Sequence, residues 1–319
     1  MKQFEGPLFL MGAFTLAGTS VIAARFLTEQ LGTFTITAVS LLFALLFLLP
    51  ICKGKLISSL RQMRLADAVM LALQALFGIF AFRLLLLQGL LHTTAGEAGL
   101  LTGATPAITA ILAWLLLKEQ VTLHKLSGVL GTISGVALIQ GVATSQLSTE
   151  HLLGNLLVLG AAASESVFNI LSRISAVKTT KTLDPLVQTA LVSALALVFS
   201  LVPALSEQPF AALGTADITQ WLALVWYGVF VTALAFICWY AGIKRCSAST
   251  AAAFTGMMPF TSLILSVVLL GEHAGWEQWA GGALVIFGMV LIGWQSKKSE
   301  APLTDVSLPD ACNMNESNH

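Results

Sequence analysis

The chain has 319 residues and a formal net charge of zero; 56% of its residues are hydrophobic and only 10% are charged. Soluble domains carry about a quarter charged residues, so this composition excludes an ordinary soluble protein. The mean hydropathy of +0.86 predicts a polytopic membrane protein. The zero net charge says little about partners, and we expect none made of nucleic acid.

The apolar residues form continuous runs rather than alternating patterns, which predicts an all-α membrane protein. The connections between runs are short, and the longest extend from Cys52 to Leu65 and from Ser206 to Ile218. The first run is long enough to span and is predicted to be retained rather than cleaved. In chain order we predict ten transmembrane helices, at about 7–27, 32–51, 66–90, 95–117, 124–143, 152–174, 185–205, 219–243, 247–270 and 276–295.

Basic residues set the expected orientation. With the N-terminus in the cytoplasm, all but two of the 16 lysines and arginines lie on the cytoplasmic side, and the exceptions are Arg25 and Arg83. Cytoplasmic loops carry such an excess of basic residues. We therefore predict a multi-pass protein of the bacterial inner membrane with both termini in the cytoplasm.

The second half of the chain repeats the first. Thr102-Gly103 and Pro106 recur as Thr255-Gly256 and Pro259, 153 residues later, and Glu119 recurs as Glu272. The first and sixth helices match more weakly, with Gly12 on Gly160. Because each half has five helices, an odd number, equivalent elements lie upside down to each other in an inverted-topology repeat. We predict repeats at 1–147 and 148–296, followed by a disordered cytoplasmic tail at 297–319.

These duplicated five-helix units and paired Thr-Gly-x-x-Pro signatures resemble the drug/metabolite transporter superfamily, of the EamA type with ten helices, over about residues 7–295. The resemblance implies a single-chain secondary transporter of small organic solutes such as amino acids, metabolites or drugs, often an exporter. Two related bundles would rock about a midplane site between them, giving alternating access.

The alternatives are a membrane-embedded enzyme and a channel. All five histidines fall in loops, helix ends or the tail without metal-ligand spacing, and no phosphate-binding glycine–lysine–serine/threonine motif occurs. A channel would need a continuous polar pore, whereas the polar residues here are scattered. We expect no catalytic residues, no cofactor and no metal.

Glu165 is the most informative single residue. It lies near the middle of the predicted sixth helix, and Asn169 is one turn further on the same face. A midplane carboxylate is a candidate for proton coupling or for binding a substrate amine. The alternative is a polar network that holds helices together.

Pro106 and Pro259 lie inside predicted helices, where each removes a backbone hydrogen bond and bends the helix. The freed carbonyls of Thr102 and Thr255 are then candidates to face a cavity. We interpret these four residues as a pair of hinges; the alternative is a packing kink.

Arg83 lies in the outer half of the predicted third helix, and Glu97 starts the fourth helix at similar depth. An arginine there must pair, reach the interface or face water. It is a candidate to receive an anionic substrate group, with Glu97 also near the site. The alternatives are a structural Arg83–Glu97 pair and an arginine that snorkels outward.

Two further residues are candidates for contact with substrate. Gln74 belongs to a stripe on the third helix that continues through Gly78, Ala81 and Gln88, and its alternative role is helix–helix contact. Trp226 shares a face with Phe230 and could wall a pocket, although a lipid-facing or core-facing role is the alternative.

Glycines give smooth faces to the fifth and tenth helices, where close packing within the chain and a homodimer seam are the two interpretations. These glycines are Gly128, Gly131, Gly135, Gly281, Gly282 and Gly288.

Overall fold

The computed structural model describes residues 2–117, 122–139, 151–178, 183–243, 245, 254 and 257–294. Within these residues every regular element is a helix. Glu119, Thr255 and the tail at 297–319 lie outside the described residues, so the predictions made for them are not tested by the structure.

The described helices of the first half are α1 (Lys2–Thr28), α2 (Thr33–Gln62), α3 (Leu65–Ala75), the π-helical segment η1 (Leu76–Ala81), α4 (Phe82–Leu90), α5 (Ala95–Thr102), α6 (Thr105–Leu117) and α7 (Leu123–Ile139). Those of the second half are α8 (Leu152–Lys178), α9 (Pro185–Ser206), α10 (Pro209–Gly214), α11 (Ile218–Val225), the π-helical segment η3 (Trp226–Leu234), α12 (Ala235–Ile243), α14 (Met257–Leu270) and α15 (Trp276–Trp294).

Each of the ten predicted spans contains described helix. Seven helical segments are long and apolar enough to cross a membrane by their length and composition, and the apolar stretches Leu126–Ile139 and Met257–Leu270 are shorter. The structure therefore supports several membrane crossings, and the number ten stays a prediction.

Both of the long connections between predicted spans contain helix. Helix α2 continues to Gln62, and Cys52 is buried within it; the helix passes through Gly54 and ends before Met63. The connection after Ser206 contains the short helix α10, which begins at Pro209, since proline is well suited to the first position of a helix.

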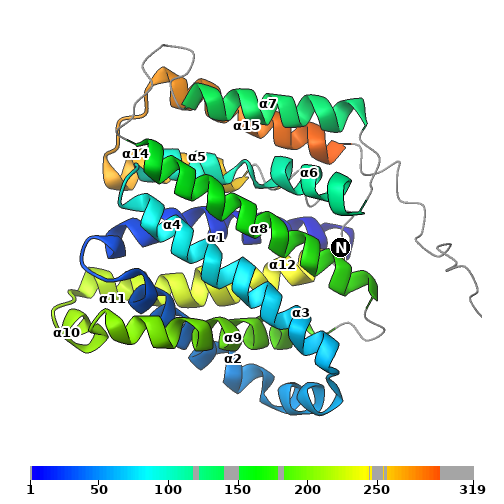
Figure 1. The fold of residues 1–319 in the computed structure, drawn as a ribbon, viewed down its shortest axis with the longest axis vertical. Coiled ribbons are helices and arrows are strands. Elements are labelled where there is room, and N and C mark those ends of the chain that lie inside the picture. The colour runs from blue at the N-terminus through cyan, green and yellow to red at the C-terminus, as the bar shows by residue number, and fades with distance from the viewer. Residues whose placement is uncertain are drawn as a thin grey trace, which may run out of the picture.

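The helices pack in an order that relates the two halves. Helices α7 and α15 lie side by side at one edge of the bundle, and α2 and α9 pack together at the opposite edge (Figure 1). Between them, α8 packs on α4 and on both α5 and α6, while α1 packs on α12 and α14. Since α1 and α8 occupy equivalent places in the two halves, the surroundings of one match those of the other.

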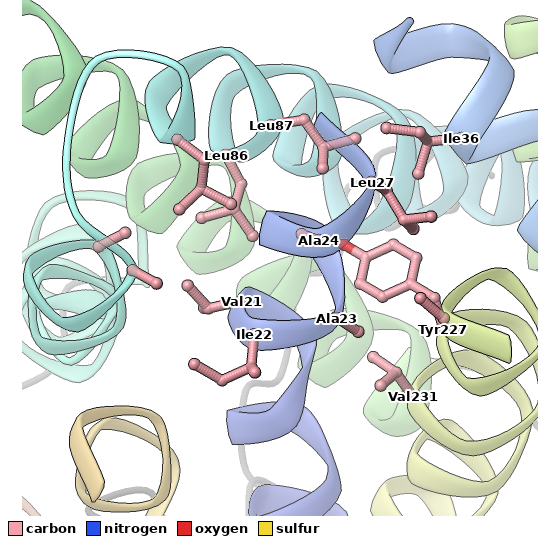
Figure 2. Packing of buried hydrophobic residues seen from close by; sticks show 14 of the residues in the cluster. Val21, Ile22, Ala23, Ala24, Leu27, Ile36, Leu86, Leu87, Tyr227 and Val231 are labelled. Carbon is pink, nitrogen blue, oxygen red and sulfur yellow. The ribbon is translucent and has the colours of Figure 1, made fainter. Parts of the chain in front are cut away.

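Helix α1 passes through the centre of the largest apolar cluster. Val21 and Leu27 of α1 are fully buried among Leu87 of α4, Ile36 of α2 and Tyr227 of η3 (Figure 2). Lipid tails are as apolar as leucine, so close van der Waals packing rather than removal from water holds such helices together.

The glycine faces of α7 and α15 meet each other. A Cβ atom added at Gly135 would lie 2.6 Å from the carbonyl oxygen of Gly281, and one added at Gly288 would lie 2.5 Å from that of Gly128. The glycines thus let two backbones of the same chain approach closely. Because they already serve this contact, they give no support to the predicted homodimer seam.

Candidate functional site

The break between α5 and α6 forms the first candidate site. Helix α5 ends at Thr102 and α6 begins at Thr105, one residue before Pro106. A proline has no N–H for the carbonyl four residues earlier, which here is that of Thr102. The Thr105 hydroxyl lies 2.8 Å from this carbonyl oxygen. A neighbouring side chain thus supplies a donor in place of the missing one, and a role of the Thr102 carbonyl in lining a cavity stays a prediction.

Helix α8 brings Glu165 to this break. Its Oε2 atom lies 2.8 Å from the Thr105 Oγ1 atom, and the next residue, Ser166, donates to the Thr105 carbonyl oxygen at 2.9 Å. Glu165 is half-buried and forms no ion pair within the described part of the chain. We call Glu165, Thr105, Thr102 and Ser166 the Glu165 cluster.

Asn169 lies one turn further along α8 and is also half-buried. Its neighbour Phe168 packs closely on η1, since a Cβ atom added at Gly78 would lie 2.4 Å from its ring. The predicted role of Asn169 in binding stays a prediction.

The second proline break is described in part. Pro259 is buried in the first turn of α14, and its partner Thr255 lies outside the described residues. On the facing helix α1, a Cβ atom added at Gly18 would lie 2.6 Å from the Met258 carbonyl oxygen. Gly18 and Met258 are the sequence equivalents of Ser166 and Thr105, so α1 meets this break at the same place where α8 meets the first.

Arg83 forms a second buried cluster, on another side of α4. Its guanidinium donates to the Ser40 hydroxyl on α2 at 2.8 Å and to the Thr232 hydroxyl on η3, and it lies 4.4 Å from the centre of the Tyr227 ring. We call these four residues the Arg83 cluster. The arginine does not snorkel outward, since it is buried among three helices.

The predicted Arg83–Glu97 pair is not formed. Arg83 has no carboxylate partner in the described ranges. Hydroxyl oxygens and an aromatic face stabilise the cation instead, the latter by attraction to the ring quadrupole. No local pattern predicts these partners, because they come from helices that are distant along the chain.

Glu97 belongs to a third cluster, at the N-terminus of α5. Its Oε2 atom accepts from the Thr93 hydroxyl at 3.0 Å and from the Asn155 amide at 3.1 Å, and it lies 3.3 Å from the His151 Nδ1 atom. The Glu272 carboxylate caps the same helix end. A helix N-terminus stabilises negative charge, so this cluster ties α5, α8 and the end of α14 together.

Glu272 was predicted only as the repeat equivalent of Glu119, and Asn155 and His151 were not predicted as functional residues. One feature of the sequence could have indicated this cluster: all three residues lie at predicted helix ends on the same side of the membrane as Glu97. The cluster borders a small depression that Ser266 and Gln278 also line.

Gln74 and Trp226 make contacts between helices. Gln74 is buried and accepts a hydrogen bond from Gln188 of α9 at 3.2 Å. Trp226 is 38% exposed, stacks on Phe230 with ring centres 4.3 Å apart, and donates to the Thr19 hydroxyl of α1 at 2.9 Å. The predicted pairing of the two rings on one face is correct, and contact of either residue with substrate stays a prediction.

The predicted stripe on the third helix does not form a single face. Gln74 bonds to α9, Gly78 packs on α8, and Gln88 donates to Thr33 at the start of α2. The π-helical segment η1 lies between Gln74 and Gln88. Its wider turn changes the phase of the side chains, so positions counted at helical intervals no longer align.

Comparison with known proteins gives consistent results. The sequence model of the EamA-like transporter family matches residues 4–141 and 152–294. The chain is 30% identical over 304 residues to the uncharacterized transporter YetK of Bacillus subtilis, which covers 94% of this chain and 90% of that protein. It is 28% identical over 244 residues to the probable terminal-alkyne amino-acid exporter of Streptantibioticus cattleyicolor, covering 76% of this chain and 78% of that protein.

A solved crystal structure has a similar fold. The TM-score is 0.63 at 20% identity, with 93% of this chain and 99% of that chain covered. At this identity the likeness shows the fold alone.

Proposed function

We propose that this chain, which belongs to the EamA-like transporter family, exports small organic solutes by alternating access about a site at Glu165. Membership confirms the resemblance to the drug/metabolite transporter superfamily. The chain is a multi-pass membrane transporter, and its partners are the lipid bilayer and a small-molecule substrate.

The observation that carries the proposal is the setting of Glu165. Its half-buried carboxyl group has no ion-pair partner among the described residues and touches the point where the α5–α6 helix is broken. An ionisable group inside a membrane bundle is costly unless it serves an ion or substrate pathway. We assign to it the uptake and release of a proton or of a substrate ammonium group.

The packing supports a rocking motion between two inverted repeats. The surroundings of α1 and α8 match, and the two halves meet along the glycine contact of α7 with α15. Inverted repeats allow one half to tilt against the other around a fixed site. Pro106 and Pro259 would act as paired hinges in that motion.

Arg83 is a second candidate site in the same proposal. The guanidinium has five N–H donors, and two hydroxyl oxygens are its hydrogen-bond acceptors in the described residues. The other N–H groups of the guanidinium are suited to donate to a substrate carboxylate when the helices around α4 separate. Together with Glu165 this would favour solutes that carry both an ammonium and an anionic group, and one similar protein is named as an amino-acid exporter.

The test is a screen of solute transport in everted membrane vesicles, with and without a proton gradient. Glu165→Gln should reach the membrane normally and lose most gradient-driven accumulation, while Glu165→Asp should keep part of it with a changed pH dependence. Ser164→Ala is the matched control, because it removes a neighbouring polar group that bonds only the Phe77 carbonyl.

Wild-type transport by Glu165→Gln at every pH would remove Glu165 from the site. Saturable counterflow would distinguish a carrier from a channel, and formation of a chemically altered product would indicate an enzyme.

A further inference from the structure

The Thr105 hydroxyl has one proton and two oxygen neighbours at equal distance. The Thr102 carbonyl oxygen and the Glu165 Oε2 atom both lie 2.8 Å from Thr105 Oγ1. A carbonyl oxygen only accepts, whereas a carboxyl oxygen donates when it is protonated and accepts when it is ionised. If Glu165 carries a proton and donates it to Thr105, Thr105 can give its own proton fully to Thr102, and both contacts are complete hydrogen bonds; if Glu165 is ionised, the two acceptors must share the single proton of the Thr105 hydroxyl.

The Thr102 carbonyl depends on this bond. Pro106 cannot provide the usual helical N–H, and Thr102 is only 1% exposed, so water does not replace it. In the described part of the chain, the Thr102 carbonyl accepts its hydrogen bond from the Thr105 hydroxyl. A buried carbonyl without a partner is destabilising.

We infer that Thr105 couples the protonation of Glu165 to the conformation of the α5–α6 break. With Glu165 protonated, the chain of two hydrogen bonds holds the break as the structure shows it. When Glu165 releases its proton to water, the Thr105 hydroxyl turns to the carboxylate and the Thr102 carbonyl loses its donor. The break is then more stable in a shape that gives this carbonyl another donor. Thr105 is thus a positioning residue, and the inference depends on the proposed protonation of Glu165.

No other charged side chain competes for Glu165 in the described structure. The helices packed on α8 are α3, η1, α4, α5 and α6. Their charged residues near the bundle are Asp67, which bonds the Arg64 amide, Arg83, which bonds Ser40, and Glu97, which is held at the opposite end of α5. A change in the protonation of Glu165 therefore acts on its hydrogen-bond partner Thr105 and not on a charged neighbour.

The coupling is present in only one half. In the second half the residues equivalent to Glu165 and Thr105 are Ala17 and Met258, which have neither a carboxyl nor a hydroxyl group. The matching contacts of Ser166 with Thr105 and of Gly18 with Met258 establish this correspondence in space. The two proline breaks are alike in sequence, but only the break at Pro106 would respond to a proton.

The test uses the full-length protein in lipid nanodiscs, without substrate. Infrared difference spectroscopy over a pH titration follows the carboxylic acid band of Glu165, identified by its loss in Glu165→Gln. In parallel, spin labels at the exposed residues Val69 on α3 and Leu115 on α6 report the distance between these helices as the pH changes. The four native cysteines are replaced beforehand.

We expect Thr105→Val to keep the carboxylic acid band at a shifted frequency and to lose more than half of the pH-dependent distance change. Thr105→Ser should behave like the wild type. Thr189→Val on α9 is the matched control and should also behave like the wild type, because it removes a buried hydroxyl that bonds the Pro185 carbonyl of its own helix, outside the Glu165 cluster. If the valine variant fails to fold, Thr105→Ala provides the same comparison.

A wild-type distance response in Thr105→Val or Thr105→Ala would overturn the coupling while leaving Glu165 as a protonation site. Absence of any titrating carboxylic acid band that depends on Glu165 would overturn both the coupling and the proton-binding part of the proposed function.

Discussion

The carboxylate of Glu272 lies 2.8 Å from the amide nitrogen of Gly96, although 176 residues separate them in sequence. Its other oxygen accepts from the amide of Ala95, also at 2.8 Å. The C-terminal end of α14 thus caps the N-terminal end of α5. These helices belong to the predicted fourth and ninth spans, which are equivalent in the two halves, so this contact joins the halves at one end of the bundle.

Removing the charge of Glu272 should loosen this end. Glu272→Gln keeps one acceptor oxygen but loses its favourable interaction with the helix dipole, so we expect a cost of about 1 kcal/mol. The measurement is thermal unfolding of the purified protein in detergent. Glu277→Gln, on the next helix, is the control and should change the midpoint little. Equal midpoints for the two variants would contradict the capping role.

The glycine contact gives a matched pair of stability variants. Gly135→Ala places a methyl group 2.6 Å from a backbone oxygen of α15, which cannot move alone, whereas Gly131→Ala meets its nearest atom at an ordinary 3.6 Å. We expect Gly135→Ala to destabilise by about 1–3 kcal/mol and Gly131→Ala to be nearly neutral. Unfolding in detergent measures both, and the reverse order would show that α7 and α15 do not pack as described.

Straightening either proline break should slow transport. In Pro106→Ala and Pro259→Ala the new N–H can donate a helical hydrogen bond if the helix straightens, so membrane abundance should be nearly unchanged while the transport rate falls several-fold. Pro203→Ala, near the end of α9, is the control and should transport normally. Unchanged transport in both break variants would assign these prolines to packing alone.

Arg83 should matter for transport more than for folding. Arg83→Met fills a similar volume and also removes the cost of burying a charge, so thermal stability should be unchanged or higher. If the guanidinium binds an anionic group, transport of such solutes should fall at least about tenfold, equivalent to ~1.4 kcal/mol. Ser40→Ala, which removes one of its hydroxyl partners, should have a smaller effect. A stable variant with full transport would make Arg83 a structural residue.

The orientation can be tested by chemical labelling. The bias of basic residues predicts that an impermeant thiol reagent added outside cells modifies a cysteine introduced at Ser148 and leaves the native Cys246 unmodified. Labelling in the reverse sense would invert the predicted topology.

Sequence reasoning located the helices well because hydropathy depends on local composition. It also located the interruption at Pro106, since a proline acts within its own helix. It failed where partners are set by packing between distant segments. The neighbours of Arg83 are hydroxyl and aromatic residues of α2 and η3, which carry no distinctive pattern in the sequence. The hydrogen bond from Thr105 to Thr102 was missed because proline geometry shows which carbonyl is freed, but not which side chain replaces the lost donor.

The two π-helical segments lie in corresponding helices of the two halves. Segments η1 and η3 end at Ala81 and Leu234, which are equivalent positions in the two halves. A π-helical turn holds one residue more than an α-helical register allows, as a single-residue insertion would produce. Because the corresponding helix of each half carries such a segment, the widened turn occurs in both halves and is not confined to one of them.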